Sequence, residues 1–68
     1  MTMQIEVNGR PEMVESRATV ADLLQRLKLS PIRVAVEINK DLVPRKIFAD
    51  TVLRDGDHVE IVTLVGGG

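Results

Sequence analysis

The fold of this chain is decided near its start, by the stretch Met3-Gln4-Ile5-Glu6-Val7-Asn8-Gly9. Apolar and polar residues alternate from Met3 to Val7, which is the period-two pattern of a strand with one buried face. The dipeptide Asn8-Gly9 follows at once and favours the positive φ values of a two-residue hairpin turn. An antiparallel hairpin is therefore predicted. Its expected cross-strand pairs are Val7 with Arg10, Ile5 with Glu12, and Met3 with Val14.

A single short helix is expected after the hairpin, over residues 20–27. Its apolar residues recur at i, i+3, i+4 and i+7 and so form one stripe that can cover a sheet. Thr19 can accept from a free backbone N–H of the first turn, and Asp22 complements the helix dipole. Ser30-Pro31 marks the exit, because a residue before proline is pushed out of the helical region. The stripe consists of Val20, Leu23, Leu24 and Leu27.

Three extended segments are predicted in the second half of the chain, over residues 33–38, 42–44 and 58–64. The first is apolar enough for a central strand. The second contains Pro44, which cannot donate a ladder hydrogen bond and so favours a sheet edge, as Pro11 does in the hairpin. An irregular segment before the last strand supplies apolar side chains that could plug the end of the core. These are Ile47, Phe48, Val52 and Leu53.

The order of these elements indicates an α+β fold of the β-grasp, or ubiquitin-like, type. The expected architecture is a mixed sheet of four to five strands with one main helix packed on one face. The final strand of this arrangement is usually central. We therefore expect a β-grasp domain over residues 1–64 and a flexible glycine tail, residues 65–68, that leaves from the middle of a rigid sheet.

Composition limits the classes of function. The chain has 68 residues, 44% of them hydrophobic, no cysteine and a formal net charge of −1, which predicts one domain without disulfides or thiolate metal sites. The charges are scattered and the only aromatic residue is Phe48, which argues against a nucleic-acid partner. No apolar stretch reaches the ~20 residues of a membrane span, and no signal peptide is evident. We expect a soluble, cytoplasmic protein without a membrane partner.

The sequence contains no recognisable catalytic or metal-binding constellation. His58 has no second histidine or any cysteine to complete a cluster, so it is interpreted as a surface histidine at a strand start. Asp55, Asp57 and Glu60 lack the spacing of a calcium loop and are expected in a solvated turn and on a strand face. We predict no metal site and no active site of its own. The chain is interpreted as a protein on which enzymes act.

Two features at the end of the chain point toward a partner. Val62 and Leu64 lie on the strand face that His58 and Glu60 begin. They are either an outward docking patch or residues that the chain's own loops cover or that lie where the sheet twists. The chain then ends on Val65-Gly66-Gly67-Gly68. Glycine has no Cβ and can enter narrow spaces, so this tail could offer its terminal carboxylate to another protein's active site. The alternative is an ordinary frayed terminus.

Short motifs along nearly the whole chain form one pattern. They are Met3-Gln4-Ile5, Thr19-Val20, Leu23-Leu24, Val36 to Asn39, Val43-Pro44-Arg45, Asp55-Gly56-Asp57 and the terminal Val65-Gly66-Gly67-Gly68. With these residues the chain resembles the family of small sulfur carrier proteins of thiamine biosynthesis.

The resemblance implies a definite chemistry for the tail. Gly68 would be the covalent carrier: an E1-like adenylyltransferase uses ATP to adenylate its carboxylate, and a sulfur donor system, a sulfurtransferase or desulfurase, converts the adenylate to a thiocarboxylate. Thiazole synthase would take up the sulfur. Gly66 and Gly67 would thread the partner's active site, and no cofactor would be bound by the chain itself. The residues implied for partner docking are Val62, Leu64 and Val65.

Two rival functions remain open at the level of sequence. The small subunit of molybdopterin synthase is similar in fold, tail and activation chemistry, although it is usually longer. A β-grasp regulatory or adaptor module is also compatible with Asn8-Gly9-Arg10, Val43-Pro44 and Gly56-Asp57. Such modules are embedded in larger proteins, however, and have no use for a free diglycine end.

Overall fold

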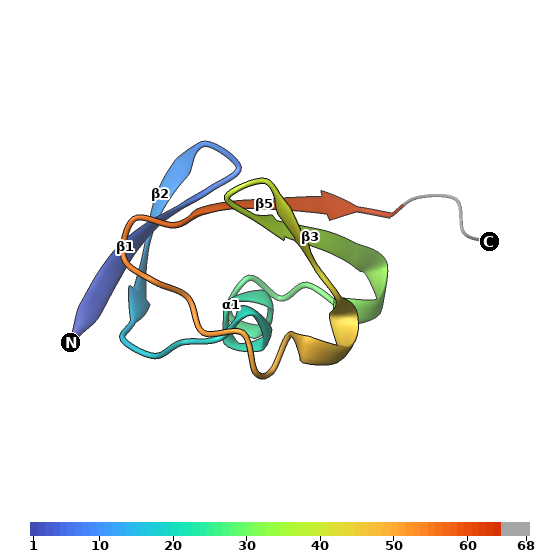
Figure 1. Cartoon of the computed structure of the whole chain (residues 1–68), viewed down its shortest axis with the longest axis horizontal. Helices are drawn as coiled ribbons and strands as arrows, with labels where there is room; N and C mark the ends of the chain where they lie inside the picture. The colour runs from blue at the N-terminus through green and yellow to red at the C-terminus, as the bar shows by residue number, and fades with distance from the viewer. Residues whose placement is uncertain (65–68) are drawn as a thin grey trace.

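The computed structural model describes residues 1–64 and contains a five-stranded mixed sheet with one α-helix across one face (Figure 1). The strand order is β2-β1-β5-β3-β4, and only the pairing of β1 with β5 is parallel. The predicted β-grasp fold is thereby confirmed. The elements are β1 (Thr2–Val7), β2 (Arg10–Glu15), α1 (Val20–Arg26), β3 (Val34–Ile38), β4 (Asp41–Val43), β5 (His58–Thr63), and 3-10 helices over Pro31–Arg33 and Arg45–Ile47.

The first hairpin has the predicted register. Asn8 and Gly9 adopt φ values of 50° and 83°, the left-handed region that a two-residue hairpin turn requires. The strand β2, which contains Pro11, lies at one edge of the sheet as expected. All three predicted pairs are present: Val7 with Arg10, Ile5 with Glu12, and Met3 with Val14.

The helix begins at a reciprocal cap, which explains its sharp N-terminus. The Thr19 hydroxyl accepts from the Asp22 N–H at 3.1 Å, and the Asp22 carboxylate accepts from the Thr19 N–H at 2.9 Å. These bonds satisfy two backbone donors that the first helical turn leaves free. The predicted stripe faces the sheet, with Val20, Leu23 and Leu24 at most 1% exposed and Leu27 half-buried against the same core.

The segment before β5 plugs the core with two of the four side chains expected there. Phe48 and Leu53 are buried, but Ile47 and Val52 are 40% and 51% exposed. Of the four side chains available to plug the core, Phe48 and Leu53 therefore do so, and Ile47 and Val52 do not.

The turn before β5 is more tightly bonded than the sequence suggested. Asp57 is only 9% exposed. Its carboxylate accepts from the Arg54 N–H at 2.8 Å and from the Asn39 side-chain amide at 3.1 Å. The expectation of a solvated Asp57 is wrong, because this carboxylate joins its own turn to the β3–β4 turn. These bonds hold the first residue of β5 in place.

The final strand is central, as predicted. It pairs with β1 on one side and, through five residue pairs from Val34–Thr63 to Ile38–Val59, with β3 on the other. The Leu64 N–H still donates to the Arg33 carbonyl at 2.7 Å, so pairing continues to the last residue that the structure describes. No helix in residues 1–64 is long and apolar enough to cross a membrane.

Candidate functional site

The sheet has one face covered by α1 and one face that no helix covers within residues 1–64, here called the open face (Figure 1). Side chains of β5 alternate between the two faces. Val59 and Ile61 are buried beneath the helix, whereas His58, Glu60 and Val62 are exposed on the open face. The open face is therefore the surface on which β5 is exposed.

The apolar end of β5 is exposed. Val62 is 60% and Leu64 52% exposed, so the alternative that the chain's own loops cover them is wrong within residues 1–64. Val62 lies directly opposite Ala35 of β3. Leu42 of β4 is 66% exposed and lies diagonally beside Ala35, because it pairs with Glu37. We call this surface the apolar patch: Ala35, Leu42, Val62 and Leu64.

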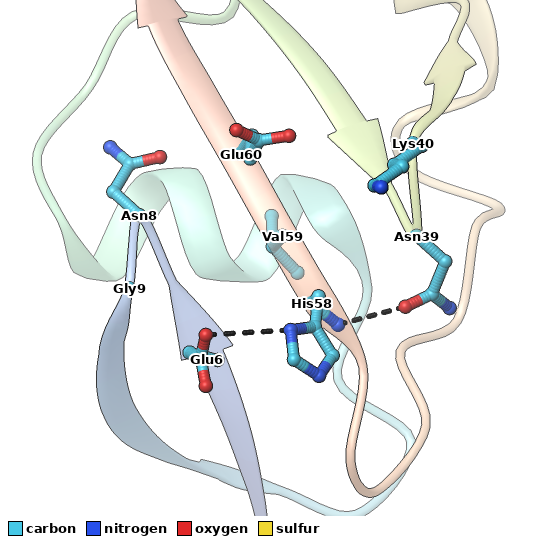
Figure 2. A pocket seen from close by; sticks show the side chains of 8 residues that line it. All are labelled: Glu6, Asn8, Gly9, Asn39, Lys40, His58, Val59 and Glu60. Atoms are coloured by element: carbon cyan, nitrogen blue, oxygen red, sulfur yellow. Dashed lines mark hydrogen bonds and ion pairs between the residues drawn. The ribbon is translucent and has the colours of Figure 1, made fainter.

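The other end of β5 forms the floor of a shallow hollow between the two hairpin turns (Figure 2). Figure 2 shows Asn8 and Gly9 on one side, Asn39 and Lys40 on the other, and His58 and Glu60 between them. The hollow measures about 580 Å³ and opens to solvent. Its lining residues are Glu6, Asn8, Gly9, Asn39, Lys40, His58, Val59 and Glu60.

The hollow contains one ion pair and no recognisable catalytic arrangement among its lining residues. The His58 Nδ1 lies 3.4 Å from the Glu6 Oε2, with side chains 67% and 45% exposed, so the pair contributes little to stability. The backbone N–H of His58 donates to the Asn39 Oδ1 at 3.0 Å. Within residues 1–64, no group of three or more acidic, histidine or cysteine residues could hold a metal ion.

Asn8 positions β5, although the sequence pattern predicts it only as part of a turn. The Asn8 Oδ1 accepts from the Ile61 N–H at 2.8 Å, and its Nδ2 donates to the Ile61 carbonyl at 3.1 Å. The Asn8 side chain thus takes the place of a strand backbone where β1 has already ended. An asparagine in this turn was visible in the sequence, but its partner lies 53 residues away. The two bonds fix β5 immediately before Val62.

The predicted site residues divide into two groups. Val62 and Leu64 are both exposed at the C-terminal end of β5, and Val62 pairs with Ala35 of β3. His58 is an exposed residue at the start of β5, as predicted. Val65, Gly66, Gly67 and Gly68 lie outside the residues that the structure describes. The described part of the predicted site is therefore the exposed end of β5.

Fold and site together define a β-grasp protein that exposes an apolar patch along its central C-terminal strand. Comparison with known proteins identifies the family. The model of the ThiS family matches residues 2–68, and the chain belongs to this family.

Named relatives and solved structures agree with that assignment. The sulfur carrier protein ThiS of Escherichia coli is 32% identical over 66 residues, which cover 97% of this chain and 100% of the relative. The crystal structure of the thiamine biosynthesis protein ThiS from Geobacter metallireducens is 38% identical and superposes with a TM-score of 0.82, covering 97% of this chain and 100% of that one. The chain is thus a ThiS-like, ubiquitin-like sulfur carrier.

A third similar protein is much longer than this chain. The thiazole synthase of Magnetococcus marinus is 41% identical to this chain over 66 residues, which cover 97% of this chain but only 20% of that protein. In that polypeptide, a carrier-like segment and a further, much longer part belong to one chain.

Proposed function

We propose that this chain carries sulfur as a thiocarboxylate on Gly68 and delivers it for thiazole formation in thiamine biosynthesis. The observation that carries the proposal is the family match, which extends through the glycines to residue 68. The central position of β5 supports it, because a tail that follows a strand paired on both sides starts from a fixed point. Catalysis would belong to the partner enzymes.

The chemistry requires three steps at the Gly68 carboxylate. A carboxylate oxygen first attacks the α-phosphorus of ATP on an E1-like adenylyltransferase, which forms an acyl adenylate and releases pyrophosphate. A sulfur nucleophile from the donor system, a sulfurtransferase or desulfurase, then attacks the acyl carbon. The C–O bond to AMP breaks, and AMP leaves with the original carboxylate oxygen. Because the donor's nucleophile is the outer sulfur of a persulfide, the product is an acyl disulfide. A thiol reductant then attacks the donor sulfur, the S–S bond breaks, and the thiocarboxylate is released while the thiol and the donor sulfur form a disulfide. The adenylate is needed because a free carboxylate is a poor electrophile.

Thiazole synthase is the proposed sulfur acceptor. The relative from Magnetococcus marinus that bears this name contains a segment 41% identical to this chain. A carrier and an acceptor that work together gain from being joined, because a linked partner is present at high effective concentration. The relatives are named for thiazole synthesis, sulfur carriage and thiamine biosynthesis, which favours this pathway over the molybdopterin alternative. The proposal differs from a regulatory module in that the tail itself carries sulfur.

The apolar patch is the proposed docking surface for the adenylyltransferase. Val62 and Leu64 are exposed on the strand that leads to the tail, so contact there would aim the following residues at the enzyme. Val65 would extend this contact, and Gly66 and Gly67 would thread a channel too narrow for larger side chains. No residue of the described chain is required to make or break bonds.

The proposal predicts that removing Gly67 and Gly68 abolishes adenylation. The measurement is ATP-dependent AMP transfer to the intact protein, followed by mass spectrometry after incubation with the purified cognate E1-like adenylyltransferase. The truncated chain should keep the thermal midpoint of the full chain, because the core residues all lie within residues 5–61. Adenylation of the truncated chain at the wild-type rate would contradict the role of Gly68.

A further inference from the structure

The open face carries an acidic pair directly beside the apolar patch. Glu37 of β3 and Glu60 of β5 are cross-strand partners, so both side chains project from the open face. Figure 2 shows Glu60 on the open side of β5, above His58. On the other side of β5, Glu6 pairs with His58 and adds a third carboxylate on a third adjacent strand.

This acidic pair is unfavourable for the isolated fold. Like charges directly opposite each other on neighbouring strands destabilise a sheet. Within residues 1–64 the ion pairs join Arg26 to Glu12 and His58 to Glu6, so neither Glu37 nor Glu60 is neutralised by a cation. Lys40 lies at the rim of the hollow without forming such a pair. Residues that oppose the fold are expected where function requires them.

The acidic pair and the apolar patch form one continuous surface. The next outward row toward the C-terminus is Ala35 with Val62, and rows on one strand face are about 7 Å apart. Leu42 is the direct cross-strand partner of Glu37, so the patch also borders the pair on the β4 side. A protein that covers Val62 therefore covers the region next to both carboxylates and lowers the local dielectric constant.

We propose that the acidic pair selects the partner: a cationic side chain of the adenylyltransferase, an arginine or lysine, lies between Glu37 and Glu60 while an apolar surface of that enzyme covers the apolar patch. This inference rests on the proposed function. Opposed side chains with Cβ atoms about 5 Å apart can both accept from one guanidinium or ammonium group. Charge complementarity of this kind sets partner choice and orientation, while the apolar patch supplies contact area.

The test measures the affinity of the full chain for the purified cognate adenylyltransferase by calorimetry. In E37K/E60K, repulsion should weaken binding about tenfold or more at low salt. The loss should shrink toward 1 M salt, where the screening length falls to about 3 Å. The neutral variant E37Q/E60Q should bind about threefold more weakly and yet melt at a higher temperature, since the repulsion within the sheet is gone. A purely structural role of the two glutamates would not give this opposite movement.

The control variant is E15K/D50K, which changes the net charge equally at exposed positions away from the acidic pair. It should bind like the wild type. Equal affinities for E37K/E60K and its control, or no binding of the wild type, would overturn the inference. Adenylation of Gly68 is followed separately in the same samples by mass spectrometry. Wild-type adenylation with unchanged affinity in E37K/E60K would refute the acidic-pair inference alone, whereas absent wild-type adenylation would refute the proposed function.

Discussion

Single polar side chains hold the start and the middle of β5 in this protein. Asp57 binds a backbone N–H of its own turn and the amide of Asn39, and Asn8 binds both backbone groups of Ile61. Buried polar groups cost stability unless they are paired, so each of these contacts also restricts where the strand can lie. The position of Val62 on the open face therefore depends on side chains far from it in sequence.

We predict that Asn8→Ala lowers the free energy of unfolding by about 1–3 kcal/mol, because it leaves the part-buried N–H and carbonyl of Ile61 without their partners. Urea denaturation measures this loss. Asn8→Gly is the matched variant, since glycine favours the φ of 50° found here but lacks the amide. It should also be destabilised. Wild-type stability of Asn8→Gly would show that the residue matters only for its backbone conformation.

These contacts also explain what the sequence could not predict at the residue scale. The turn propensity of Asn8-Gly9 depends on adjacent residues and was correctly interpreted. The second role of Asn8 and the burial of Asp57 depend on segments that meet only after folding. Local patterns contain no information about such partners, so the prediction that Asp57 is solvent-exposed is wrong.

At the scale of elements, β5 has two different faces. Its helix-facing residues belong to the core, and its open-face residues change from charged to apolar along the strand. The alternation of β5 could be derived from the sequence, because strand periodicity is strict. The exposure of Val62 could not, because an outward patch and cover by the chain's own loops were both compatible with the pattern. The contribution of Leu42 could not, because it requires knowledge that β4 pairs with β3 in this register. The 3-10 helices were likewise missed, since three residues give no periodic signal.

We predict that Val62→Asp and Leu64→Asp each weaken binding to the adenylyltransferase about tenfold or more, because a charge would face an apolar surface of the partner. Binding calorimetry tests this. Both side chains are more than half exposed, so the free energy of unfolding should change by no more than about 0.5 kcal/mol.

Val52→Asp provides the comparison, because Val52 is 51% exposed but lies outside the sheet. Its affinity for the enzyme should equal that of the wild type. An equal loss in Val52→Asp would mean that any exposed aspartate disturbs binding, and the apolar patch would then have no special role.

At the scale of the whole molecule, the fold holds β5 at the centre of the sheet. The helix and the connecting segment close the core on one face, while the sheet leaves the other face free around β5. The β-grasp class could be predicted because hairpin, helix and late return strand follow one another in recognisable order. The role of the tail rests on family membership, since Val65 to Gly68 lie beyond the described residues.

The most direct test of the central claim is the mass of the intact protein after incubation with ATP, the cognate adenylyltransferase, the sulfur donor and a thiol reductant. The predicted result is a mass increase equal to the replacement of one oxygen by sulfur, located at Gly68 by fragmentation and absent when ATP is omitted. An unmodified Gly68, in a reaction whose enzymes modify a known ThiS carrier supplied as a control, would contradict the account.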